Sequence, residues 1–155
     1  MAAVMIPAIG ISPTETVQVN VTNMAPLPLA GGLAPTCQSV ILFYYTPSNS
    51  PGSLTPFAQM TFSVVSGQTF SFAAPYASTP GTGGRQMIRP AINLATQNGV
   101  VENGIVTSSP ICILVTSVET FDTTNGVSHS VVNPPPVTQT PDSSTQARAA
   151  VTFPR

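Results

Sequence analysis

The stretch Thr14-Glu-Thr-Val-Gln-Val-Asn-Val-Thr22 alternates strictly between apolar and polar residues over most of its length. Successive side chains of a β-strand point to opposite faces, so Val17, Val19 and Val21 would share one face. The polar residues between them would share the other face. The pattern predicts a half-buried strand, with one side on a core and the other in water.

Further strand patterns follow along the chain, separated by segments rich in proline, glycine and serine. The expected strands are residues 39–45, 58–64, 69–73, 85–95, 111–122 and 127–132, with a small hairpin at 98–104. The segment 39–45 is continuously apolar, which predicts a central strand covered on both faces. Ser66-Gly67 is expected to turn the chain into a hairpin of two paired strands, and Asn125-Gly126 into another.

About seven strands with frequent turn signals predict an all-β fold, an antiparallel two-sheet sandwich. An eight-stranded jelly roll is the alternative arrangement. The sandwich domain is expected to span residues 14–132. Residues 1–13 would form an apolar N-terminal extension, and residues 133–155 a C-terminal extension rich in proline, serine and threonine.

The two cysteines begin strands that are far apart in the sequence, and this placement is similar to the inter-sheet cystine of immunoglobulin-like domains. The chain also resembles small bacterial immunoglobulin-like β-sandwich proteins of unassigned function. The matching segments are Thr16 to Asn23, Cys37, Cys112-Ile-Leu114 and Glu119-Thr-Phe-Asp122. The resemblance implies an immunoglobulin-like sandwich. We expect a disulfide between Cys37 and Cys112, and hence an extracellular or cell-surface location.

The composition argues against several classes of function. Only 6% of the residues are charged, against about 25% in an ordinary soluble domain. Four arginines and no lysine are too few to neutralise a nucleic-acid backbone. Two cysteines and one histidine supply no metal-binding motif, and no glycine-rich phosphate loop is present. We therefore expect no nucleic acid, metal or cofactor, and no membrane span, because no apolar run reaches about 20 residues.

One pair of residues has a catalytic character. A two-residue turn at Asn125-Gly126 would place Asp122 directly opposite His129, and a carboxylate that orients an imidazole is part of a hydrolytic triad. Ser128 and Ser130 flank the histidine, but neighbours on a strand point to the opposite face and cannot reach its ring. We therefore expect an exposed cross-strand pair and no enzyme.

Two other groups of side chains suggest contacts or binding. Arg85 and Arg89 lie on one face of their strand and are expected to pair with Glu102 and Glu119; an anionic ligand held by both arginines is the alternative. Three tyrosines are expected to pack in the core or against neighbouring strands, and a sugar-stacking surface is the alternative. Its members would be Tyr44, Tyr45 and Tyr76.

A formal net charge of -1, few charged residues and free sheet edges favour association of the chain with copies of itself. We expect a structural self-assembling subunit of an extracellular filament, pilus-like fibre or sheath. A surface adhesion or carbohydrate-binding module, and a viral capsid decoration or tail protein, are the alternatives. The terminal segments are expected to pair with a neighbouring subunit through strand exchange. The residues involved would be Val4, Met5, Ile6, Val151, Thr152 and Phe153.

Overall fold

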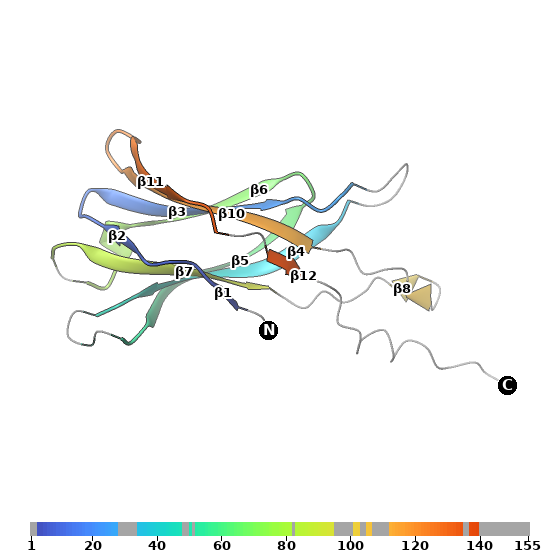
Figure 1. The fold of residues 1–155 in the computed structure, drawn as a ribbon, viewed down its shortest axis with the longest axis horizontal. Helices are drawn as coiled ribbons and strands as arrows, with labels where there is room; N and C mark the ends of the chain where they lie inside the picture. The colour runs from blue at the N-terminus through green and yellow to red at the C-terminus, as the bar shows by residue number, and fades with distance from the viewer. Residues whose placement is uncertain are drawn as a thin grey trace.

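Figure 1 shows a computed structural model of the 155-residue chain, which forms two packed layers of strands. The structure describes residues 3–27, 34–47, 50, 52–81, 83–94, 101–102, 105–106, 112–134 and 137–139. Within these ranges there is no α-helix, only one short 3-10 turn, η1 (Tyr76–Ser78). The all-β fold is therefore confirmed.

The lower layer in Figure 1, here sheet A, has the strand order β1-β7-β4-β5, and β2 lies beside β7 next to β1. All of its neighbouring strands are antiparallel. The strands are β1 (Ala3–Met5), β2 (Ile9–Ile11), β4 (Thr36–Tyr45), β5 (Thr55–Val65) and β7 (Gln86–Leu94).

The upper layer, sheet B, has the order β11-β10-β3-β6, with β12 also paired to β10. Its strands are β3 (Glu15–Asn23), β6 (Thr69–Pro75), β10 (Cys112–Asp122), β11 (Ser128–Val132) and β12 (Val137–Gln139). The strands β8 (Val101–Glu102) and β9 (Ile105–Val106) pair with each other. Two antiparallel sheets confirm the predicted sandwich.

The core lies between the sheets, and the alternating pattern of β3 supplies one of its walls. Val17, Val19 and Val21 are all fully buried, as the spacing predicts. From sheet A, Ile41 and Phe43 of β4 are fully buried as well. A disulfide joins Cys37 of β4 to Cys112 of β10 with a Cα–Cα distance of 5.7 Å, so it bridges the two sheets as expected.

The strand β4 is central in sheet A, but only one of its faces is covered. Burial alternates along it, with Ser39, Ile41 and Phe43 buried on the inner side and the residues between them less buried. The prediction that residues 39–45 are covered on both faces is therefore wrong. The segment 39–45 is continuously apolar because its outward side chains are apolar too. Nothing in the described part of the chain buries that outer side fully.

The turn at Ser66-Gly67 does not form the predicted hairpin, because β5 belongs to sheet A and β6 to sheet B. Gly67 has φ of 81°, which permits the sharp turn. The chain crosses from one sheet to the other, and the inward side chains Phe62 and Phe70 stack with centroids 4.6 Å apart and planes 5° apart. Ring stacking across the core replaces backbone pairing between these strands.

The two terminal extensions also differ from the expected domain boundaries. Residues 3–11 form β1 and β2 and contribute Ile6, Ile9 and Ile11 to the core, so this segment belongs to the sandwich. Within the range 133–155, β12 pairs with β10 of the same chain. Residues 140–155, including the predicted assembly residues Val151 to Phe153, lie outside the described part of the chain.

Candidate assembly site

The N-terminal strand, defined here as residues 3–11, forms the edge of sheet A along β7. Val4 pairs with Ile92, and Ile9 pairs with Ile88. Between these two ladders the backbone N–H of Ile6 donates to the carbonyl of Pro90 at 3.0 Å. Pro7 cannot donate a hydrogen bond, which accounts for the break between β1 and β2.

The side chains of this strand complete the core. Ile6, Ile9 and Ile11 are 1%, 7% and 0% exposed, and Val4 packs against the same cluster. Burial of isoleucine contributes about 1.5–3 kcal/mol per side chain, so the strand supplies a substantial part of the hydrophobic stabilisation. In the single chain Val4, Met5 and Ile6 lie against its own β7, and their pairing with a neighbouring subunit stays a prediction.

The N-terminal strand is joined to the rest of the sandwich by a short connection, residues 12–14, here called the hinge. It carries the chain from β2 in sheet A to β3 in sheet B. The N–H of Glu15 donates to the carbonyl of Ser12 at 2.9 Å, and the N–H of Thr123 donates to Thr14 at 2.7 Å. Three residues, one of them Pro13, therefore make the whole connection.

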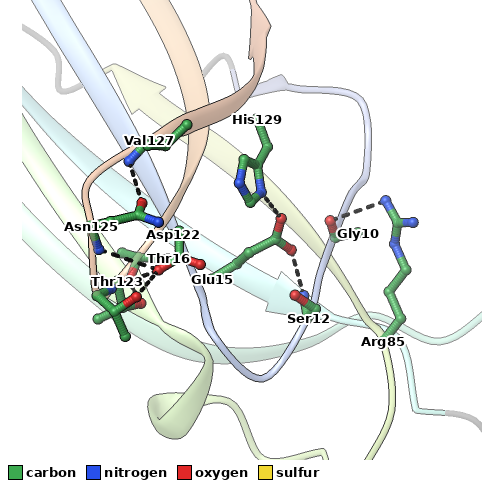
Figure 2. Close-up of polar contacts among 11 residues, drawn as sticks. Gly10, Ser12, Glu15, Thr16, Arg85, Asp122, Thr123, Asn125, Val127 and His129 are labelled. Atoms are coloured by element: carbon green, nitrogen blue, oxygen red, sulfur yellow. Dashed lines mark hydrogen bonds and ion pairs between the residues drawn. The ribbon is translucent and has the colours of Figure 1, made fainter.

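Figure 2 shows a polar cluster directly beside the hinge, with Glu15 at its centre. One carboxylate oxygen of Glu15 accepts the backbone N–H of Ser12 at 2.6 Å, and the other lies 2.5 Å from Nδ1 of His129. The hydrogen bond with His129, followed by that from the Ser12 backbone, lowers the pKa of Glu15 below its ordinary value of 4.5. The cluster therefore ties the hinge to β11 of sheet B.

The predicted contact between Asp122 and His129 is replaced by the contact with Glu15. The turn is longer than two residues, since the N–H of Gly126 donates to the carbonyl of Asp122 at 2.8 Å. The pairing of β10 with β11 also shifts register between Thr120 and Phe121, which moves His129 out of line with Asp122. The prediction was wrong because a bulge and a wider turn redirect the imidazole.

Asp122 instead holds the turn in shape. Its carboxylate accepts the backbone N–H of Thr124 at 2.7 Å, accepts the hydroxyl of the same residue, and lies 3.4 Å from the N–H of Asn125. The side-chain hydrogen bond from Thr124, then the backbone one, lowers the pKa of Asp122 below its ordinary value of 3.8. This is the role of an aspartate at a turn.

The cluster differs from a hydrolytic triad in the order of its contacts. In a triad the imidazole lies between the carboxylate and the nucleophile. Here the carboxylate of Glu15 lies between the imidazole and Ser12, and Ser128 donates to Glu119 at 3.3 Å. Among the described residues no group of three or more histidine, cysteine, aspartate or glutamate side chains could hold a metal ion.

The arginines do not form the predicted ion pair with Glu119. Arg85 donates from Nη2 to the carbonyl of Gly10 at 3.3 Å, and within the described residues Nε of Arg89 is buried with no hydrogen-bond partner. Glu119 accepts from Gln18 instead. The side chain of Glu102 lies outside the described part of the structure.

The tyrosines do not form a single surface either. Tyr45 and Tyr76 pack against the core, and the hydroxyl of Tyr76 donates to Gly84 at 2.7 Å. Tyr44 lies on the outer face of β4, opposite Arg89 in the ladder. Tyr45 and Tyr76 therefore pack as expected, and the alternative of one sugar-stacking surface is not assembled from the three tyrosines.

The outer faces of the two sheets carry a contrast that the sequence patterns did not single out. The A face, the outward side of sheet A, has an apolar centre and two arginines at one end. Its members include Met5, Val40, Leu42, Tyr44, Arg85, Met87, Arg89, Ala91 and Asn93. The ladder pairs show these residues on one side because cross-strand partners share a face.

The B face, the outward side of sheet B, has a hydrogen-bonded polar centre, with Val115 exposed on the same side. Asn20 is its central residue: its amide nitrogen donates to Ser117 at 3.3 Å and to Glu119 at 3.1 Å, and its oxygen accepts from Ser71 at 2.7 Å. Gln18 donates to Asn20 and Glu119 at 2.7 and 3.1 Å. These bonds link β6, β3 and β10.

Comparison of the chain with family models, with curated proteins and with solved structures finds no match. Among the described residues, no helix has the length and apolarity needed to cross a membrane.

Proposed function

We propose that the protein is a structural subunit that joins copies of itself by exchange of the N-terminal strand. The proposal rests on the position of residues 3–11, which lie along the edge of β7 with their isoleucines in the core. This strand completes both the backbone ladder of β7 and the core, and its only covalent connection to the sandwich that follows is the three-residue hinge.

The contacts that β7 makes with the N-terminal strand can be made equally well by that strand from another copy. Exchange of an identical element conserves the hydrogen bonds and the buried isoleucines, so its free-energy cost is small. A copy that gives its strand to one neighbour and receives one from another makes a head-to-tail contact. Such a contact leads to a filament when it does not close into a ring.

The hinge favours exchange for a physical reason. Short connections that must turn sharply invite domain swapping, because an extended conformation relieves the turn. In the closed chain the turn is fastened by the bond from Glu15 N–H to Ser12 and by the Glu15 carboxylate on the Ser12 N–H. Straightening the hinge gives up these two local bonds and keeps the contact between Glu15 and His129.

The remaining parts of the assembly proposal rest on the sequence. The segment Val151 to Phe153 stays a candidate second donor strand for a neighbour. The disulfide is consistent with a protein that works in an oxidising, extracellular setting.

A pair of cysteines across the exchanged ladder tests the proposal. Ile9→Cys and Ile88→Cys together place thiols on directly opposed residues of β2 and β7. If strands exchange, oxidation links different copies and a non-reducing gel shows a ladder of multimers. Ile9→Cys alone is the matched control and should give no ladder above a dimer. Oxidation that yields only internally bridged monomers would contradict the proposal.

A hinge variant sharpens the same test. Insertion of several glycine and serine residues after Ser12 lets the strand reach its own β7 without a sharp turn, so the closed chain should dominate. The ladder should then shrink, and negative-stain images that show fibres from the natural chain should show isolated particles from the lengthened one. Fibres that are equally abundant in both would argue against exchange at this hinge.

A further inference from the structure

We infer that the A face is a second, independent contact between copies: it is the interface of a two-fold dimer in which the sheets A of two chains pack face to face. This inference goes beyond strand exchange, because the A face is the outward side of sheet A, whereas the isoleucines of the N-terminal strand are buried on its inner side.

The composition of the A face matches the buried centre of protein interfaces. Such centres are enriched in methionine, aromatic residues and arginine, and depleted of lysine and acidic residues. Met5 and Met87 are 44% and 43% exposed, and Leu42 and Tyr44 are half-buried beside them. The outward residues of β5 at the margin are polar and exposed: Gln59, Thr61 and Ser63.

The size of the face fits a dimer. Four strand positions about 4.8 Å apart, with a length of nine residues at about 3.3 Å each, cover roughly 570 Å² per copy. Two copies would bury about 1,100 Å² in total, which exceeds the ~1,000 Å² that a specific interface needs.

The positions of the arginines on the A face favour one direction of the two-fold axis over the other. Arg85 and Arg89 lie toward one end of β7, and Asn93 lies toward the other, with Ala91 between them. A two-fold axis along the strands would bring the arginines of both copies together. An axis across the strands, through the row of Met5, Ala91 and Leu42, reverses the strand direction and keeps the arginines apart.

This transverse axis also brings a hydrogen-bond donor and an acceptor opposite each other. It places Arg89 of one copy opposite Asn93 of the other, because the two residues flank Ala91 on β7 at equal distance. Both residues are half-buried on the A face, so the guanidinium of Arg89 can donate to the amide oxygen of Asn93 across the interface. By the same symmetry, Leu42 meets Leu42 and Tyr44 meets Val40.

Sedimentation velocity on the full chain tests the inference over a range of concentrations. Leu42→Lys places two lysines opposite each other at the axis and should raise the dissociation constant of the dimer by more than about tenfold. Met5→Lys, at a more exposed position of the same row, should act in the same direction and serves if Leu42→Lys does not fold. Val115→Lys is the matched control, since Val115 is 37% exposed on the B face.

A gain of affinity is the sharper readout. Asn93→Asp puts a carboxylate opposite Arg89 of the other copy and should tighten the dimer by about threefold to tenfold. A chain that stays monomeric, or dimers that respond alike to Leu42→Lys, Met5→Lys and Val115→Lys, would overturn the inference. A natural chain that stays monomeric while truncation after residue 139 produces dimers would place the C-terminal segment on the A face and would also overturn it.

The two proposals fail separately. The cysteine ladder of Ile9→Cys with Ile88→Cys reports strand exchange and should survive Leu42→Lys. The dimer on the A face should survive the lengthened hinge. Loss of only one of these two signals identifies which contact is wrong.

Discussion

The two outer faces of the sandwich differ in how their side chains are satisfied. On the B face, Gln18, Asn20 and Glu119 satisfy one another through hydrogen bonds between neighbouring strands. On the A face, Met5 and Met87 are exposed, and the Nε atom of Arg89 has no partner among the described residues. The centre of the B face is hydrogen-bonded within the chain, whereas the A face exposes two methionines.

The two faces are expected to contribute to different properties, the B face to stability and the A face to association. Substitutions on the B face break bonds inside one chain and should change the free energy of unfolding. Substitutions on the A face remove little from one chain and should change the contact between chains. With few charged residues, repulsion between copies of the chain is weak. Confining the association to one face would then limit unspecific contacts.

The largest expected loss of stability comes from removing the covalent link between the two sheets. Replacement of both cysteines, Cys37→Ala with Cys112→Ala, removes a cross-link with a sequence separation of 75 residues. The chain-entropy model gives a loss of about 4.5 kcal/mol in the free energy of unfolding. Urea denaturation measures it. Reductant should destabilise the natural chain and leave the double variant unchanged; equal responses would contradict the role of the disulfide.

A smaller effect separates the faces directly. Glu119→Ala leaves the amides of Gln18 and Asn20 without their shared acceptor and should lower the free energy of unfolding by about 1–2 kcal/mol. Met87→Ala on the A face should change it by less than about 0.5 kcal/mol. Thermal unfolding of the two variants measures both changes. A greater loss of stability for Met87→Ala than for Glu119→Ala would contradict the assignment of stability to the B face.

The inner side of sheet B offers a gain of stability. Thr116 is 2% exposed, and its hydroxyl has no hydrogen-bond partner among the described residues. Thr116→Val keeps the shape and removes the unpaired polar group, so the free energy of unfolding should rise by about 1 kcal/mol. Chemical denaturation measures the change. Destabilisation by this variant would mean that the hydroxyl is satisfied in the folded protein.

The smallest expected effect depends on pH. Because the pKa of Glu15 is lowered in the folded chain, its carboxylate stabilises the fold above its ordinary pKa of 4.5. That stabilisation is lost as the pH falls through the lowered value. Glu15→Gln should therefore reduce stability at pH 6 by less than about 1 kcal/mol and flatten its dependence between pH 5 and pH 3. Unfolding curves at several pH values measure this.

Much of the fold could be predicted from the sequence because its signals are local. Alternation in residues 14–22 predicted β3 to within one residue, and the turn residues marked most of the strand ends. The pairing of strands was harder. A glycine turn such as Ser66-Gly67 shows that the chain reverses, but the next strand can pair in the same sheet or cross the core.

The site was harder to predict because its contacts are distant in sequence. Glu15 and His129 are separated by 114 positions, and they meet only because a register shift in β10 and β11 redirects the imidazole. The N-terminal strand has a proline in its middle and a partner far along the chain, so local patterns indicated an extension. Alternation does mark Ile9 and Ile11 as sharing a face, and this was the available signal.

The distance between the N-terminal strand and β7 also affects the order of events during synthesis. Val4 pairs with Ile92, so 92 minus 4, or 88, further residues must be made before the partner exists. At about 5–20 residues per second this takes roughly 4–18 s. During that interval the isoleucines have no partner strand in their own chain, whereas a neighbouring chain that has made its β7 but not yet closed its own N-terminal strand onto it can supply one. Closely spaced ribosomes would therefore increase strand exchange, and sparse translation would favour closed chains.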